Sequence, residues 1–356
     1  MNNFLKNLSL SVSLQEKIIF AKHLAIMIKA GMPLLDAINM LQQQTRSRSM
    51  SKILESVVKD VSNGQFLSKS LEKYQSVFGD LFIQLIKVGE TGGILSENLV
   101  YLADELKKKA ELRRKVVGAL IYPSIILLAT LGIAGFLTIY IFPKIIPVFS
   151  SLKAELPITT KILISISNLL TQHGGLAMLA LLIIVIVIWF LLKVRTIRFY
   201  WHRVLLSLPI VGKIARSVNM ANFSRALGLL LKSDVKIVNA INITAGTLSN
   251  LVYRDELAKS SSNIEKGEYI SKYLMTRGDL FPIMFANMIA VGERTGNLSE
   301  TLLYLAEFYE NSVDDLTKNL SNVLEPVLMV AMGVIVGFVA ISIITPIYGV
   351  TQTLSR

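Results

Sequence analysis

Apolar residues in the first part of the chain repeat at the spacing of one helical face. From Leu14 to Ile28 they follow each other in steps of four and three, which places them on a single stripe of an α-helix. Glycine and proline between such segments indicate turns, so we expect an antiparallel bundle of about six helices joined by short loops. The expected helices are Leu14 to Ile28, Pro33 to Gln44, Met50 to Ser62, Phe66 to Lys73, Asp80 to Val88 and a sixth that starts near Leu95 and runs towards the membrane.

One ten-residue pattern occurs twice. The stretch from Val88 to Glu97 reads VGETGGILSE, and the stretch from Val291 to Glu300 reads VGERTGNLSE, at an offset of 203 residues. The same offset pairs Phe20 with Phe223, Gly64 with Gly267, Phe78 with Phe281 and Pro123 with Pro326. A gap-free match of this length indicates that one folded unit was duplicated. Function must therefore be sought in both copies.

Three longer stretches are apolar and carry no charged residue. Helices of about 20 residues cross a hydrocarbon core of roughly 30 Å, and the first two stretches have 24 and 19 residues. The sequence therefore predicts an all-α membrane protein with two homologous cytoplasmic helical bundles and three transmembrane helices. The expected order is bundle 1–118, span 119–142, outer loop 143–173 with a short helix from Thr159 to Leu170, span 174–192, bundle 193–325, span 326–348 and outer tail 349–356.

The basic residues next to the spans predict the orientation. They gather on the flanks that the positive-inside rule assigns to the cytoplasm, whereas the outer loop has three lysines, Lys144, Lys153 and Lys161. The flanking residues are Lys107, Lys108, Lys109, Arg113, Arg114 and Lys115 before the first span, and Lys193, Arg195, Arg198 and Arg203 after the second. We therefore expect a multi-pass protein with a cytoplasmic N-terminus and an outer C-terminal tail.

Composition narrows the chemistry further. The chain is 52% hydrophobic with a formal net charge of +12 and no cysteine, and its mean hydropathy is +0.54. Thiolate nucleophiles and cysteine metal sites are thereby excluded. Because the positive charge lies beside apolar spans, we expect anionic phospholipids rather than nucleic acid as its counterpart. The carboxylates of the repeated motif could bind a divalent cation, but nothing in their spacing requires one.

Catalytic motifs are not found in the sequence. His23, His173 and His202 lie in three separate segments, and neither a nucleophile elbow nor a zinc-protease motif occurs. Gly212 and Lys213 lack the preceding glycine of a phosphate-binding loop. We expect no enzyme activity, no cofactor and no metal site.

The residues that begin the first span carry a resemblance to a known family. They are Lys115, Val116, Ala119, Leu120, Tyr122, Pro123, Ile126, Thr130, Leu137, Ile141, Phe142 and Pro143. With the doubled Gly-Glu-x-x-Gly-x-Leu pattern and the stretch from Leu208 to Gly212, the chain resembles the inner-membrane platform proteins of type II secretion and type IV pilus machines, the F family of type II secretion. Pilus and secretion members both remain possible.

The resemblance implies a non-enzymatic protein of the bacterial plasma (inner) membrane. Such a platform couples a cytoplasmic assembly ATPase to pilin polymerisation and protein secretion. The expected partners are that ATPase, pilin or pseudopilin subunits, other inner-membrane assembly components, anionic phospholipids and further copies of the chain as a homo-oligomer, with no nucleic acid.

The repeated motif supplies the candidate partner-binding residues: Gly89, Glu90, Gly93, Glu97, Gly292, Glu293, Gly296 and Glu300. One interpretation is structural, because glycines allow a helix-helix turn and a glutamate can cap the following helix. Asn297 and Glu300 also have the spacing of a capping box. The other interpretation is a surface that contacts partners, since Glu90 and Glu293 are both present while Thr91 is replaced by Arg294.

Two further pairs stand where spans begin, Tyr122 with Pro123 and Glu325 with Pro326. Proline fits the first turn of a helix, so helix starts are one interpretation, and a kink that couples bundle motion to the span is the other. Glu325 would then reach the interface by snorkelling. A rival function is a transporter or channel subunit built from duplicated bundle-plus-span units. The spans contain no ionisable residue for a substrate path, which disfavours it.

Overall fold

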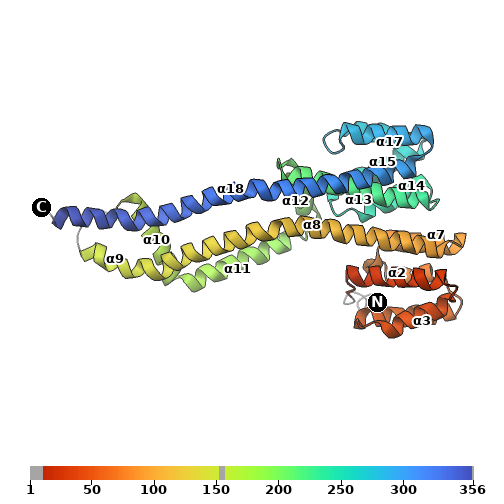
Figure 1. Cartoon of the computed structure of the whole chain (residues 1–356), viewed down its shortest axis with the longest axis horizontal. Coiled ribbons are helices and arrows are strands. Elements are labelled where there is room, and N and C mark those ends of the chain that lie inside the picture. The colour runs from red at the N-terminus through yellow and green to blue at the C-terminus, as the bar shows by residue number, and fades with distance from the viewer. Residues whose placement is uncertain (1–10, 152–156, 355–356) are drawn as a thin grey trace. The chain divides into compact units, whose positions relative to one another are not determined.

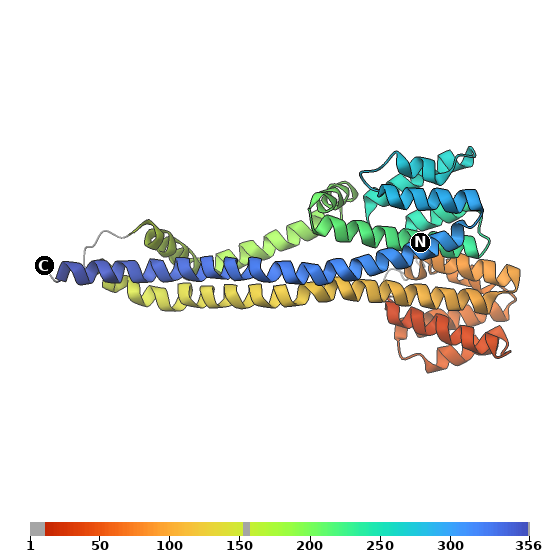
Figure 2. The ribbon, with the colours of Figure 1, turned by 45° about the horizontal axis from the view of Figure 1, so that its top comes forward.

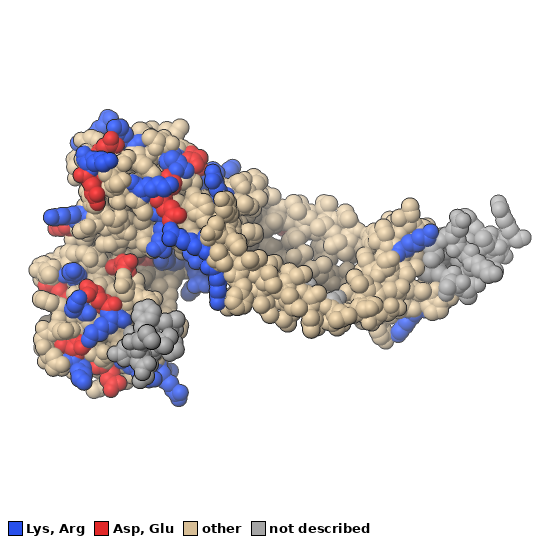
Figure 3. Space-filling view, turned by 180° about the vertical axis from the view of Figure 1, so that it is seen from behind, with Lys and Arg blue, Asp and Glu red and all other residues tan. Residues whose placement is uncertain are grey.

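The computed structural model describes residues 11–151 and 157–354 and contains helices but no strand within them. The chain divides into two compact units, one of residues 1–115 with 202–315 and one of residues 116–201 with 316–356. We call the first the bundle unit and the second the span unit. Figures 1 and 2 draw their helices. On the face drawn in Figure 3, charged side chains gather over the bundle unit, whereas the span unit is almost free of them. This distribution fits a water-exposed bundle unit and a lipid-exposed span unit.

The first bundle is built from short consecutive helices that pack on their neighbours. They are α2 (Leu14–Lys29), α3 (Leu34–Gln44), α4 (Arg48–Ser62), α5 (Leu67–Glu72), α6 (Gln75–Phe78), α7 (Asp80–Gly92) and the beginning of α8 (Leu95–Phe136). Helix α2 starts at a capping box, in which the Ser13 and Glu16 side chains each accept from the other's backbone N–H. The sequence did not reveal α6, because four residues are too few for a helical period. As expected, α8 runs without a break towards the membrane.

The second bundle repeats the first. Its helices are α12 (Arg195–Ser207), α13 (Val211–Lys232), α14 (Ile237–Thr247), α15 (Leu251–Glu265), α16 (Ile270–Met275), α17 (Ile283–Thr295) and the beginning of α18 (Leu298–Leu354). Helices α14, α15, α16 and α17 begin and end 203 residues after α3, α4, α5 and α7. The predicted duplication is therefore a duplication of structure.

Each bundle core is centred on three phenylalanines. Phe20, Phe78 and Phe82 have ring centroids 4.8–6.2 Å apart. Their counterparts Phe223, Phe281 and Phe285 have centroids 5.8–6.4 Å apart. All six side chains are buried. Aromatic pairs at such distances add to the hydrophobic stabilisation, so the paired phenylalanines of the sequence repeat are equivalent core positions.

The span unit holds the helices that are long and apolar enough to cross a membrane. Among the residues that the structure describes, three candidates lie within Leu95–Pro147, Gly174–Leu191 and Leu298–Thr345, in agreement with three predicted spans. A π-helix (η1, Leu137–Ile141) lies at the end of the first predicted span. In its described part, the expected outer loop is largely helical, with α9 (Phe142–Ser151) and α10 (Ile158–Gln172) leading to α11 (Gly174–Leu191). The predicted Thr159 to Leu170 helix is thus confirmed in a longer form.

Helix α10 is tied to its neighbours by buried hydroxyl groups. Ser167 donates to the carbonyl of Thr138 in η1 at 2.8 Å, and Thr160 donates to the carbonyl of Ser342 in α18 at 2.9 Å. Both bonds satisfy backbone carbonyls where water is scarce. They hold α10 against η1 and α18.

Candidate functional site

The repeated Gly-Glu motif lies in the last turn of a helix rather than in the turn itself. Helix α7 continues to Gly92 and α17 continues to Thr295, so the predicted helix end at Val88 was wrong. The chain turns at the next glycine, where Gly93 and Gly296 are left-handed with φ of 70° and 72°. In each copy the following residue donates back to the first glycine, Ile94 to Gly89 and Asn297 to Gly292. This is the helix-ending hydrogen bond that a left-handed glycine permits.

The first glycine of each motif lets two helices approach closely. A Cβ atom on Gly89 would stand 2.8 Å from the Cα of Leu95 in α8. On Gly292 it would stand 2.8 Å from the Thr301 hydroxyl oxygen and 3.1 Å from the Cα of Leu298 in α18. Real Cβ contacts of that length do not occur without displacement of a neighbour. Glycine is therefore a packing requirement at both positions.

The glutamates cap a short helix that lies earlier in the chain. The Glu90 carboxylate accepts from the backbone N–H groups of Leu67 and Ser68, the first two residues of α5. Glu293 does the same for Ile270 and Ser271 at the start of α16, at 2.7 and 3.1 Å. Helix N-termini have unpaired N–H groups and a partial positive charge, so a carboxylate is well suited there. The capped helix is thus the preceding short one, not the following one that the sequence suggested.

The last glutamates of the motif point to solvent. Glu97 and Glu300 lie exposed in the first turns of α8 and α18. The pKa of Glu97 is lowered, because its carboxylate accepts from its own backbone N–H and from the Ser96 hydroxyl. Asn297 directly precedes α18, which is where a capping box would place it. Of the predicted partner-binding residues of the motif, Glu97 and Glu300 are the charged ones whose side chains are exposed.

These contacts change what alanine should do at Glu90 and Glu293. The loss of a helix cap costs about 0.5–2 kcal/mol of stability. We expect Glu90→Ala and Glu293→Ala each to lower the melting temperature and the steady-state level of the protein. Glu90→Gln should lower both by a smaller amount than Glu90→Ala. Glu97→Ala is the matched control and should leave both unchanged. Full stability of the double alanine variant, measured by thermal unfolding in detergent, would contradict the capping role.

The prolines of the predicted span starts lie inside long helices. Pro123 is an interior residue of α8, which begins at Leu95, and Pro326 is an interior residue of α18, which begins at Leu298. The helix-start interpretation was therefore wrong. A proline inside a helix removes one backbone hydrogen bond, so each long helix carries a weak point there. Tyr122 and Glu325 beside them are exposed.

The bundle unit also contains a buried ion cluster that sequence reasoning missed. The Arg225 guanidinium of α13 donates through Nε to Glu310 of α18 at 2.7 Å and stands 3.7 Å from the Glu105 carboxylate of α8. Glu105 is 5% exposed. Burial raises the pKa of Glu105 to about 7, although the Arg225 charge lowers it. The cluster therefore joins helices of both copies around one arginine.

Two lysines of the basic run before the first span also contact helix α18 of the second copy. Lys108 lies 3.7 Å from Glu310, and Lys115 lies 3.2 Å from Asp314. These two lysines were expected at lipid headgroups, but they meet acids of α18. A comparison of the copies could have indicated this, because basic Lys107 is replaced by acidic Glu310 at the offset of 203 residues.

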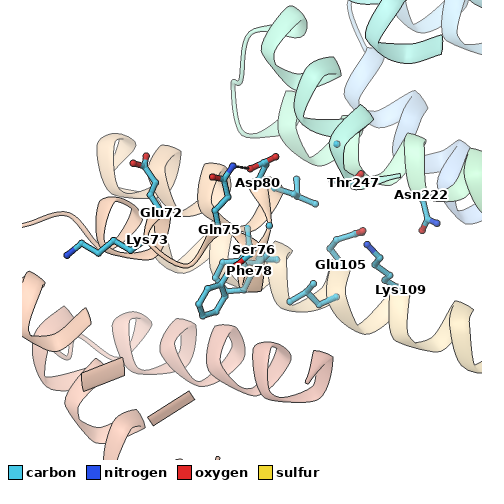
Figure 4. A pocket seen from close by; sticks show the side chains of 16 residues that line it. Glu72, Lys73, Gln75, Ser76, Phe78, Asp80, Glu105, Lys109, Asn222 and Thr247 are labelled. Atoms are coloured by element: carbon cyan, nitrogen blue, oxygen red, sulfur yellow. Dashed lines mark hydrogen bonds between the residues drawn. The ribbon is translucent and has the colours of Figure 1, made fainter. Parts of the chain in front are cut away.

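A pocket of about 660 Å³ opens beside the cluster, between helices of the two copies (Figure 4). Its wall includes Asp80, Glu105 and Lys109 from the first copy and Asn222 and Thr247 from the second. Asp80 accepts a hydrogen bond from Gln75. Carboxylates and amines are mixed along this wall, and among the described residues no group of three metal-ligating side chains is assembled. The pocket has no constellation that we assign to a cofactor.

Comparisons with known proteins find the repeat independently. A family model described as type II secretion system (T2SS), protein F matches residues 20–143 and again residues 223–346. The type IV pilus assembly protein PilC of Thermus thermophilus is 36% identical over 351 residues, which cover 96% of this chain and 84% of that protein. The type II secretion system protein F of Pseudomonas aeruginosa is 31% identical over 341 residues, which cover 96% of this chain and 84% of that protein. That of Vibrio cholerae is 31% identical over 347 residues, with 97% and 85% covered.

Proposed function

Since the chain belongs to the type II secretion system protein F family, we propose that it is an inner-membrane platform that couples a cytoplasmic assembly ATPase to the polymerisation of pilin or pseudopilin subunits. The observation that carries the proposal is the duplicated family unit, with a candidate span in the long last helix of each copy. Relatives bear pilus-assembly and secretion names alike. Assembly of a pilus and assembly of a secretion pseudopilus are both compatible with this proposal.

The long helices suggest how movement would be transmitted. Helices α8 and α18 each run without interruption from the bundle unit into a candidate span. A helix is stiff along its axis, so displacement of a bundle by a partner would reach the bilayer. Pro123 and Pro326 remove a hydrogen bond in each of these helices. We propose these prolines, with Tyr122 and Glu325 beside them, as the places where that displacement becomes a bend.

The experiment that tests the proposed function is a gene deletion with complementation. Loss of this chain should abolish surface fibres or secretion while the levels of the ATPase and of the pilin subunits stay normal. Unchanged fibres and secretion in the deletion strain would overturn the proposal. A solute flux through liposomes that contain only this protein would favour a transporter instead.

We propose that the exposed side chains of Glu97 and Glu300, which we call the rims of the two motifs, contact partners in the machine. The charge-reversing variants Glu97→Lys and Glu300→Lys should impair fibre assembly, because charge complementarity controls encounter with a partner. Protein level should remain normal, since exposed substitutions usually change stability by within about 0.5 kcal/mol. Surface fibres and protein level are measured in the same strains. Normal assembly in the double variant would exclude both rims, whereas loss of the protein itself would show a structural role.

Topology gives a prediction that does not depend on the partners. A reporter fused after Arg356 should behave as extracytoplasmic, whereas one in the exposed turn at Gly278 should be cytoplasmic. Ser260, in the same bundle, is unsuitable for insertion because it is buried in α15. The reason for the expectation is the basic flanks and the equivalence of the two copies. A cytoplasmic signal from the C-terminal reporter would contradict three spans.

A further inference from the structure

Helix α12 follows α11 after only three residues and has two unlike sides. One side is fixed to the second bundle. The ring nitrogen Nδ1 of His202 accepts from the backbone N–H of Leu251 at 3.0 Å, and the carbonyl of Leu206 accepts from Arg216 at 3.1 Å. The Leu206 side chain is buried. The orientation of the helix about its own axis is therefore defined.

The opposite side of α12 is apolar and uncovered. Its helical residues follow in steps of three, one and three, which is one helical stripe, and the exposed Leu208 comes directly after the last helical residue, Ser207. The residues are Ile197, Tyr200, Trp201, Val204 and Leu208, with exposed fractions of 37, 62, 50, 53 and 43%. Contiguous apolar surface of this kind on a folded protein usually marks a binding face.

Charge identifies what covers this stripe. From Lys193 to Leu208 the sequence contains four basic residues and no acidic one. Arg198 and Arg203 flank the stripe in the helical period, one on each side. A basic amphipathic helix with aromatic and aliphatic residues on its free face is typical of segments that lie in a membrane interface.

The neighbouring span supports the same occupant. Helix α11 ends at Leu191, and Lys193 stands 3.5 Å from the centre of the Trp189 ring. Tryptophan and lysine at a helix end are typical of the headgroup level. The next residues of the chain, which begin α12, therefore start near that level.

A broken transmembrane span is the obvious alternative, since α12 and α13 form a bent pair at 110° that is long and apolar enough to be considered. Helix α13, however, is a core helix of the second bundle and buries Phe223, Leu227 and Leu230 there. It also carries Arg225 in the ion cluster. It is therefore not available to cross the bilayer.

We infer that α12 lies in the plane of the membrane, with its Ile197 to Leu208 stripe inserted at the boundary of headgroups and acyl chains in an anionic leaflet. Arg198 and Arg203 then reach the phosphate groups. This contact holds the second bundle against the bilayer independently of the spans. It is a surface for lipid, not for another protein of the machine.

The test uses the two tryptophans of the chain, Trp189 and Trp201. In the full-length Trp189→Phe variant, Trp201 is the sole tryptophan and reports on α12. The variant is reconstituted in phosphatidylcholine vesicles with and without phosphatidylglycerol. Trp201 should be quenched by lipids brominated near the headgroup and shielded from iodide, with an iodide quenching constant at least about threefold below that of a water-exposed tryptophan.

The matched control places tryptophan on another exposed apolar position of the same bundle. Met284 of α17 is 52% exposed, so Met284→Trp in a Trp189→Phe, Trp201→Phe background should respond to iodide and not to brominated lipid. Arg198→Gln with Arg203→Gln should reduce the phosphatidylglycerol-dependent part of the Trp201 quenching. Equal quenching in neutral and anionic vesicles would remove the anionic preference from the proposal.

Two outcomes would overturn the membrane contact. If iodide reaches Trp201 as freely as it reaches the Met284→Trp control, the stripe faces water. If Trp201 is shielded from iodide but is not quenched by brominated lipid, a second copy of the chain covers the stripe instead.

Discussion

Arg225→Ala is expected to destabilise the bundle unit by about 3 kcal/mol, at the lower end of the range for breaking a buried ion pair. The lower end applies because the Arg225 and Glu310 side chains retain 16% and 14% of their exposure. Removal of the guanidinium leaves Glu310 and the buried Glu105 without their shared partner. For a domain of this size the melting temperature should fall by roughly 6–12 °C, measured by thermal unfolding of the purified protein in detergent.

The control is Arg254→Ala, because Arg254 is an exposed arginine of α15 in the same unit. It should change the unfolding free energy by within about 0.5 kcal/mol. A double variant, Arg225→Ala with Glu105→Gln, should recover part of the loss because the buried carboxylate of Glu105 is then no longer left without its arginine. If Arg225→Ala and Arg254→Ala melt at the same temperature, the cluster does not hold the two copies together.

Gly89→Ala is expected to be the second most damaging change. The new methyl group would overlap the Cα of Leu95, a backbone atom that cannot rotate away. Overpacking of this kind costs about 1–3 kcal/mol, so the melting temperature and protein level should both fall. Gly292→Ala should be milder, because its shortest contact is with the Thr301 side chain.

Gly92 provides the control within the same turn. A Cβ atom there meets nothing closer than 3.6 Å, to Ile94. Gly92 lies in the last turn of α7, where alanine is favoured over glycine by up to about 1 kcal/mol. Gly92→Ala should therefore be neutral or slightly stabilising in the same melting experiment. Equal losses for Gly89→Ala and Gly92→Ala would show that helix geometry, not the approach of α8, sets the requirement.

The helices, the duplication and the spans were predictable because each is a local or one-dimensional pattern. An apolar stripe such as that of α2 needs only the helical period, and a charge-free stretch needs only its length. The offset of 203 residues aligns four helices of one copy with four of the other without any structural information. Errors arose where a local signal was overruled. Gly89 was interpreted as part of a turn that ends the helix, but glycine is required there because α8 approaches too closely for a Cβ atom.

The prediction of a helix start at Pro123 was wrong for a related reason. Local propensity places proline at a helix start, but α8 passes through it. In lipid every other backbone group must still be hydrogen bonded within the helix, so continuation is favoured over a break. The outer segment also contains α10, whose Ser167 and Thr160 hydroxyls donate to carbonyls of η1 and α18, contacts that no local pattern contains.

The sequence by itself determined which segments form helices, which of them are apolar enough to span a membrane, and that the unit occurs twice. Only the tertiary structure decided what the polar residues of those segments do. Glu90 caps α5 from 22 and 23 residues away, and Arg225 meets Glu310 across 85 residues. Helical periodicity determines which face of a helix is buried, but it contains no information on which distant backbone N–H or carboxylate will meet that face. These pairings arise when the helices pack, because a buried donor or carboxylate without a partner costs more than almost any apolar contact contributes.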